Sequence, residues 1–350
     1  MSKLKSIHPG WLAALLLILA VNSCTKTGKR KLPDVSHIQV EVNLSRFETD
    51  LFSIGSGDAD LSGSVSWLRA RHPDFTRCFS ENILVPPTPV DSTAKLMAAL
   101  GRLLQFRGLQ AAFDSTMRRY SDLAWLEKDL TQAFRYYGYY YPDAIVPSVV
   151  TFVSEYQYAV VICSDSTFGI GLDMFLGRDF PFYSTFEIGI PSYRLPKMER
   201  EYILPNLFRA IAHNMYGQWA DGQTLLDQMV HNGKVMAFID AMIPKAPDWV
   251  KVDFTKEQLK WCEDNESEVW AFFKGEELLY RASKMEFIKF IADAPGTPGM
   301  PQEAPGNIGS WLGWRIVQKY MEKTGASLPE VMAEANAQQI LERSGYKPRR

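Results

Sequence analysis

The spacing of apolar residues predicts two paired helices over residues 205–240. In the first, Leu207, Ile211 and Met215 recur every four positions and therefore share one helical face. A second apolar run of the same period begins near Leu225, after a Trp-Ala-Asp-Gly turn. We expect the rest of the chain to be organised around this pair of helices.

Alternating and β-branched runs predict a small sheet ahead of the paired helices. Residues 38–44 alternate apolar and polar positions, and short β-type runs at 149–153, 158–163 and 167–171 are separated by turns. We expect the last three runs to form an antiparallel meander. Helical periodicity prevails elsewhere, so the pattern predicts an α+β fold, a mainly helical single domain with a small antiparallel sheet.

Two later helices carry capping-box patterns at their starts. Thr255 is followed three residues later by Gln258, and Ser327 by Glu330. In such a box the hydroxyl accepts a backbone N–H of the first turn, and the longer side chain accepts the N–H of the capping residue. We therefore expect helices to begin directly after Thr255 and Ser327.

The first 24 residues have the pattern of a bacterial lipoprotein signal. Lys3 and Lys5 form a basic start, and the apolar run at 11–21 is shorter than the roughly 20 residues that a membrane-spanning helix needs. The run ends in Val-Asn-Ser-Cys, which resembles a lipobox, where the thiol of Cys24 would receive diacylglycerol. An ordinary secretory signal with an incidental cysteine is the alternative.

This signal predicts three parts of the chain and a compartment. They are a signal peptide at 1–23, a lipid-anchored linker at 24–37 and one domain at 38–350. Two or more acyl chains on Cys24 would anchor it stably, so a membrane is an expected partner. No acidic residue follows the cysteine directly, and we expect the domain to face the periplasm from the inner or the outer membrane.

Composition and charge narrow the classes of function. Of the 350 residues, 46% are hydrophobic and 22% are charged, which is typical of globular proteins. Removing the two lysines of residues 1–23 from the 38 basic residues leaves 36 against 40 acidic ones, a net charge of −4. Such a chain has no large positive field for nucleic acid. The sequence also contains no Walker loop, Rossmann fingerprint, zinc ribbon, EF-hand or Ser-His-Asp nucleophile elbow.

Three cysteines remain if Cys24 is lipidated. They are Cys78, Cys163 and Cys262, an odd number that allows at most one disulfide. Their wide spacing gives no sign of a metal cluster. We interpret them as buried core thiols.

The first of the paired helices has lost most of the groups that a zinc peptidase needs. In a His-Glu-x-x-His helix two histidines on one face hold the ion, and the glutamate activates its bound water. Here these positions are His213, Asn214 and Gly217, so one group of three is present. A third ligand of such sites is the glutamate of a Glu-Gly pair on the next helix, and Asn232 stands at that position.

Five segments that span most of residues 140–350 carry a family resemblance. They are GIGLDMFLGRDFPFY (169–183), GIPSYRLPKMEREYILP (189–205), TLLDQMVHNGKVMAFIDAMIP (224–244), EQLKWCEDNESEVWAFF (257–273) and TPGMPQEAPGNIGSWLGWRIVQKYM (297–321). The stretch is similar to predicted zinc-dependent peptidases, and it resembles more closely the gliding-motility lipoprotein B (GldB) family, which keeps the scaffold and loses the ligands. The resemblance implies a zincin-like architecture without a cofactor. It also implies a role in gliding and protein-secretion machinery, with protein partners in the cell envelope.

Three functions are compatible with these features. The first is a non-enzymatic lipoprotein on a degenerate metallopeptidase scaffold. The second is an active zinc-dependent peptidase with an unusual ligand set of His213, Asp227 and His231. The third is a peptide- or glycan-binding module that uses the former active-site cleft. Its candidate contacts are the tyrosine run 136–141 and the loops 178–196 and 293–306.

Overall fold

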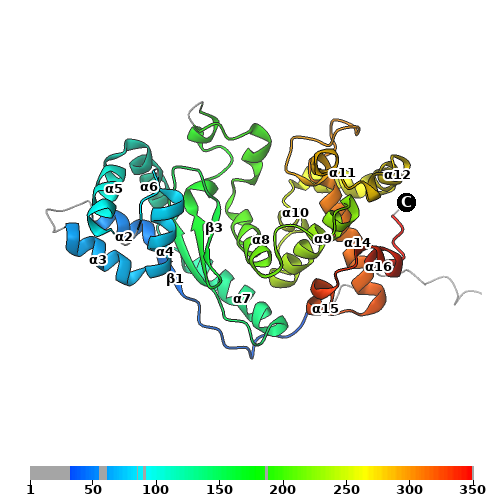
Figure 1. Cartoon of the computed structure of the whole chain (residues 1–350), viewed down its shortest axis with the longest axis horizontal. Helices are drawn as coiled ribbons and strands as arrows, with labels where there is room; N and C mark the ends of the chain where they lie inside the picture. Colours follow the sequence, from blue (N-terminus) through cyan, green and yellow to red (C-terminus); the bar gives the residue numbers. More distant parts are fainter. Residues whose placement is uncertain (1–31, 55–60, 85, 90–91, 186–187, 349–350) are drawn as a thin grey trace, which may run out of the picture. The chain divides into compact units, whose positions relative to one another are not determined.

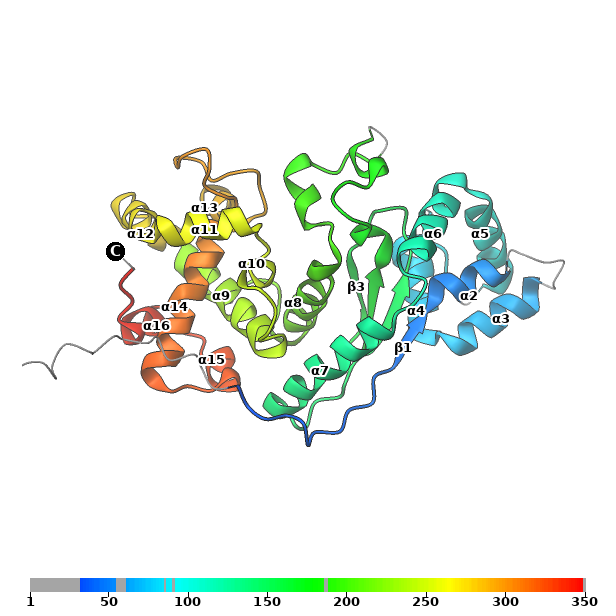
Figure 2. The same ribbon diagram turned by 180° about the vertical axis from the view of Figure 1, so that it is seen from behind.

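The computed structural model describes residues 32–54, 61–84, 86–89, 92–185 and 188–348. The described residues from Val35 onward cluster as one compact unit, which is mainly helical and contains one small sheet (Figures 1 and 2). Cys24 and the predicted signal peptide lie outside the described residues. In the described part, no helix combines the length and the apolarity that crossing a membrane requires.

The sheet has four strands and is mixed, so the predicted antiparallel sheet is wrong. The strands are β1 (Leu44–Arg46), β2 (Ser148–Phe152), β3 (Val160–Ser164) and β4 (Thr167–Gly171), in the spatial order β1-β2-β4-β3. β4 runs parallel to β2 and antiparallel to β3, and β1 runs parallel to β2. Every residue of β4 is buried, whereas β3 is partly exposed. The more apolar surroundings of β4 therefore place it inside the sheet and leave β3 at the edge.

The strand predicted at 38–44 is almost entirely absent, because only its last residue enters β1. Ile38, Val40 and Val42 are partly buried against the main hydrophobic core. The alternation therefore reflects side chains that pack against the core from an extended segment outside the sheet.

Helices make up most of the remaining structure, and the predicted helix starts are confirmed. Thr255 and Ser327 form complete capping boxes, and Thr224 forms a third one with Asp227. The helices before β2 are α2 (Phe47–Ile54), α3 (Leu61–Arg71), α4 (Pro73–Cys78), α5 (Thr93–Gln105), α6 (Arg107–Arg119) and α7 (Ala124–Tyr140), and a π-helical turn covers Phe79–Ile83. Those after β4 are α8 (Ile203–Tyr216), α9 (Leu225–Met242), α10 (Asp248–Lys251), α11 (Lys256–Asp264), α12 (Glu266–Gly275), α13 (Lys284–Ile291), α14 (Ile308–Thr324), α15 (Leu328–Ala333) and α16 (Ala337–Ser344).

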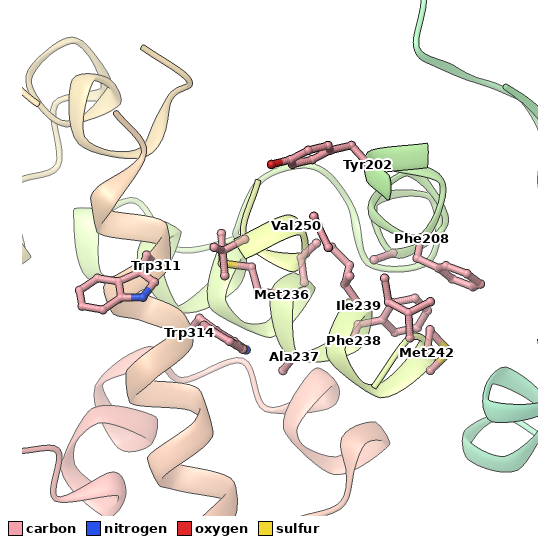
Figure 3. Close-up of a cluster of buried hydrophobic side chains, with 14 of the residues drawn as sticks. Tyr202, Phe208, Met236, Ala237, Phe238, Ile239, Met242, Val250, Trp311 and Trp314 are labelled. Atoms are coloured by element: carbon pink, nitrogen blue, oxygen red, sulfur yellow. The ribbon is translucent and has the colours of Figure 1, made fainter. Parts of the chain in front are cut away.

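Helix α9 is the centre of the main core. Of its 18 residues, only Asp227, Asn232 and Asp240 are not buried, so it is apolar on nearly every side and must be surrounded by other elements. Helices α7, α8, α10, α13, α14, α15 and α16 all contact it. Figure 3 shows part of this cluster, in which Trp311 and Trp314 project from α14 beside α9.

Helices α9 and α14 cross at glycines, with their backbones in direct contact. A Cβ atom on Gly233 would lie 2.3 Å from the carbonyl carbon of Gly313, and one on Gly313 would lie 1.8 Å from the carbonyl oxygen of Met229. Real Cβ atoms are not found so close to a backbone atom. The glycine of the Asn232-Gly233 pair is therefore required by helix packing.

The two faces of the sheet contact separate hydrophobic clusters. Val149 of β2 belongs to the main core, whereas Val150 and Phe152 belong to a second cluster built with helices α2 to α5. A disulfide between Cys78 and Cys163 joins the end of α4 to β3. The interpretation of all three cysteines as core thiols is therefore wrong for this pair, and only Cys262 is buried and free.

We expect Gly313→Ala to lower the free energy of unfolding by about 1–3 kcal/mol, because the added methyl group overpacks the helix crossing. Urea unfolding of residues 25–350 measures the change. Gly275→Ala is the matched control, since a Cβ there meets nothing within 4 Å. The control should be neutral or stabilising by up to about 1 kcal/mol, as alanine favours helix. Equal unfolding midpoints for Gly313→Ala and the wild type would contradict the close crossing.

Replacing both Cys78 and Cys163 by serine should destabilise the same fragment by about 4 kcal/mol, because the cross-link closes a long loop in the unfolded chain. The disulfide joins residues separated by 85 positions. Thiol titration of the denatured, unreduced protein checks the pairing: we expect one reactive thiol, which disappears in Cys262→Ala. Three reactive thiols would show that the disulfide is not formed.

Candidate functional site between helices α8 and α9

Helix α8 presents His213 in its last turn and ends at the next predicted ligand position. Leu207, Phe208 and Ile211 are buried and hold the helix against the core, whereas Met215, the third residue of the predicted apolar face, is exposed. Gly217 follows with φ 81° and ψ 161°, a conformation that essentially only glycine adopts. A His-Glu-x-x-His helix would continue through this position. The backbone at Gly217 is therefore incompatible with a second histidine ligand in the same helix.

The carbonyl oxygen of Gly217 brings two histidines together. Nδ1 of His213 lies 3.3 Å from it, and Nε2 of His231, on α9, lies 3.1 Å from it. Since a carbonyl oxygen only accepts hydrogen bonds, both of these ring nitrogens must carry a proton. The sequence placed each histidine on its own helix but gave no sign that the two meet at one backbone atom.

Both imidazoles are held in the neutral form at pH 7. Burial, followed by the positive charge of Arg209, lowers the pKa of His213 to about 4. Burial, followed by the charge of Lys234, lowers the pKa of His231. The pair therefore adds polar hydrogen-bonding groups to this site but no positive charge.

Asn214 and Asn232 are engaged in contacts with other elements. The side-chain amide of Asn214 lies 3.4 Å from the Asp165 carboxylate, in the turn between β3 and β4. Nδ2 of Asn232 donates to the Ser310 hydroxyl of α14 at 2.8 Å. The residue at the third ligand position thus supports the crossing of α9 with α14.

The unusual ligand set of His213, Asp227 and His231 is not assembled. The Asp227 carboxylate accepts the backbone N–H and the hydroxyl of Thr224, at 2.9 and 2.6 Å, and so caps α9. Across the described residues, no three His, Cys, Asp or Glu side chains lie close enough together to hold a metal ion. His213 and His231 lie close together, but the carboxylate of Asp227 caps the start of α9 and is not available as their third ligand.

A cavity of about 250 Å³ lies beside His231. Trp219, Asp221 and Lys234 also line it, together with the segment around α15. The Lys234 ammonium donates to the carbonyl oxygens of Met332 and Glu334, and burial lowers its pKa. The cavity beside His231 is thus small and polar, and the backbone carbonyls of Met332 and Glu334 hold the Lys234 side chain at its wall.

The three candidate contacts of the binding module reach the region of His213 only in part. From the tyrosine run, Tyr141 accepts a hydrogen bond from Tyr216 at the end of α8, at 3.1 Å. The two loops instead meet each other, because Asp293 pairs with Arg194 at 3.4 Å and with Lys197 at 3.0 Å. A larger cavity, of about 700 Å³, lies towards the other end of α8, where Tyr136 is among its lining residues. Among the described residues, the three segments therefore do not share one groove beside His213.

We expect the imidazole of His213 to stay neutral down to about pH 4, which an NMR titration of its ring signals would follow. Its folded pKa lies below the value of about 6.5 in an unfolded chain, so acid favours unfolding between these two values. His213→Gln should reduce the loss of stability between pH 7 and pH 5 by on the order of 1 kcal/mol. His37→Gln, at an exposed position, is the control. A ring that titrates near pH 6.5 would contradict the burial argument.

Comparison with known proteins gives one finding. A family model described as Gliding motility protein GldB, whose short name marks a lipoprotein, matches residues 28–348. No curated protein and no solved structure matches the chain. The match covers nearly the whole sequence and confirms the predicted resemblance to the GldB family. The chain belongs to the gliding motility protein GldB family.

Proposed function

We propose that this chain is a non-enzymatic lipoprotein of the cell envelope that supports the assembly or function of gliding-motility and protein-secretion machinery. Its family membership supports the connection to motility. The lipobox-like pattern supports an anchor on Cys24, with the folded domain facing the periplasm and binding other envelope proteins. The site that lacks enzymatic activity in this proposal is the one between α8 and α9. We infer that its scaffold is zincin-like.

The observation that carries this proposal is that two of the positions where a zinc peptidase has metal ligands hold Gly217 and Asn232. Gly217 ends α8, and Asn232 is hydrogen-bonded to Ser310 of α14. His213 is thus the one standard ligand left, and a site that has lost two of its three protein ligands should lose most of its zinc affinity. Without a metal-activated water, the cleft lacks the nucleophile that a zinc peptidase uses.

A binding role is the second candidate, and the cavity beside His231 favours it. A cleft that no longer cleaves peptides can still hold a peptide or glycan segment. Trp219 and Tyr216 add aromatic surface to its lining. This role is compatible with the first, since a bound envelope partner would need such a surface.

Residues 25–350, dialysed against zinc, should retain less than about a tenth of an equivalent of the metal by mass spectrometry, because one standard ligand cannot hold it. His213→Ala should leave this value unchanged. One equivalent of zinc that is lost in His213→Ala, together with peptide cleavage, would establish the active peptidase instead.

The same variant tests the role in cells that lack the native chain. Full-length His213→Ala should restore gliding and secretion, whereas Cys24→Ser should not, because the lipid anchor is lost. Ser23→Ala keeps a small residue before the cysteine and is the matched control. A His213→Ala chain of normal abundance that fails to restore function would contradict the non-enzymatic proposal.

A further inference from the structure

A serine, a histidine and an aspartate form a hydrogen-bonded chain far from the α8–α9 site in the sequence. The Ser45 hydroxyl, on β1, lies 3.4 Å from Nδ1 of His72. Nε2 of His72, which stands between α3 and α4, lies 2.7 Å from the carboxylate of Asp50 on α2. Three separate elements thus bring together the groups of a nucleophile, a base and an orienting carboxylate.

The hydrogen bonds fix which group donates. An ionised carboxylate only accepts, so Nε2 of His72 carries the proton and Nδ1 offers its lone pair to the Ser45 hydroxyl. The His72 side chain is only 2% exposed, and the ring of Phe47 packs edge-on against it at 5.6 Å between centroids. The imidazole is therefore held in the orientation that lets it accept the serine proton.

Asp50 has a second partner, Arg71, which lines the same cavity as Ser45. Nε of Arg71 lies 2.6 Å from the same carboxylate oxygen. Asp50 is thus neutralised by Arg71, and its contact with His72 is not needed to balance a buried charge. Arg71 is half-exposed, at 55%, and its positive charge can stabilise an oxyanion that develops beside Ser45.

Ser45, His72 and Arg71 line one cavity of about 390 Å³. Asn43, Ser148 and Thr167 add further polar groups to its wall. The space suits a short acyl group, and the interleaved hydroxyl, amide and guanidinium groups suit a polar alcohol. These features select small esters of polar alcohols as the class of substrate.

We propose that Ser45 is the nucleophile of a second, metal-independent site that hydrolyses such esters. The Ser45 oxygen bonds to the ester carbonyl carbon while its proton passes to Nδ1 of His72. The tetrahedral intermediate collapses, and the C–O bond to the alcohol breaks as the alkoxide takes that proton. An acyl group then remains on Ser45. Water, deprotonated by the same nitrogen, releases the acid, and the proton returns to Ser45.

A fluorophosphonate probe tests the proposal on residues 25–350. We expect phosphonylation of Ser45 with loss of fluoride, seen by mass spectrometry of the intact chain and its peptides. The label should be lost in Ser45→Ala, and its rate should fall by about 100-fold or more in His72→Gln, since general-base catalysis typically contributes that much. Ser283→Ala, which removes an exposed hydroxyl outside this cavity, should react at the wild-type rate.

Ser45 left unlabelled in a folded protein would overturn the proposal, as would equal labelling of Ser45→Ala. Circular dichroism establishes folding, and if His72→Gln does not fold, the two serine variants decide the outcome. Hydrolysis of p-nitrophenyl acetate that is unaffected by a chelator and lost in Ser45→Ala gives a second readout. The zinc content of the α8–α9 site is independent of this result, so either proposal can fail alone.

Discussion

The backbone contact between α9 and α14 is the constraint on which the main core depends. Helix α9 is buried on nearly all sides, and such a helix is stable only when other elements cover it closely. Glycines 233 and 313 let α14 approach to backbone distance. Trp311 and Trp314 can then bury their rings beside α9. A larger residue at either glycine would push α14 outward and open voids around both tryptophans.

This crossing also explains the chemistry of the α8–α9 site. Asn232 stands one residue before Gly233, so the geometry that brings Gly233 onto α14 also brings Asn232 to Ser310. Burying a hydrogen-bonded amide and hydroxyl at a helix contact costs less free energy than burying a carboxylate, because a buried carboxylate needs a metal ion or a cation to balance its charge. The amide side chain at position 232 and the close helix packing are therefore linked. His213 and His231 also avoid a buried charge. Both rings are neutral, and one nitrogen of each donates a hydrogen bond to the carbonyl of Gly217.

Local features of this fold could be predicted from the sequence, and long-range ones could not. The periodicity of 205–240 and the capping boxes at Thr255 and Ser327 depend on neighbouring residues, and the structure confirms them. The order of the strands depends on which strand is most buried, which runs of four to six residues do not reveal. The disulfide of Cys78 with Cys163 and the meeting of His213 with His231 join distant positions. The Ser45 site was missed for the same reason, since its residues follow no motif spacing.

The α8–α9 site and the Ser45 site are supported by different hydrophobic clusters. Substitutions at one site should therefore change the free energy of unfolding independently of substitutions at the other. The relay of Ser45, His72 and Asp50 is built on the elements around the second cluster, where Phe47 and Phe75 pack. The pair of His213 and His231 is supported by α9 and the main core. Changes at distant sites with no shared partners usually have additive effects on stability. The sheet, however, contributes to both clusters through alternate residues of β2. A substitution that shifts β2 should therefore disturb both sites at once, whereas a substitution within either site should leave the other intact.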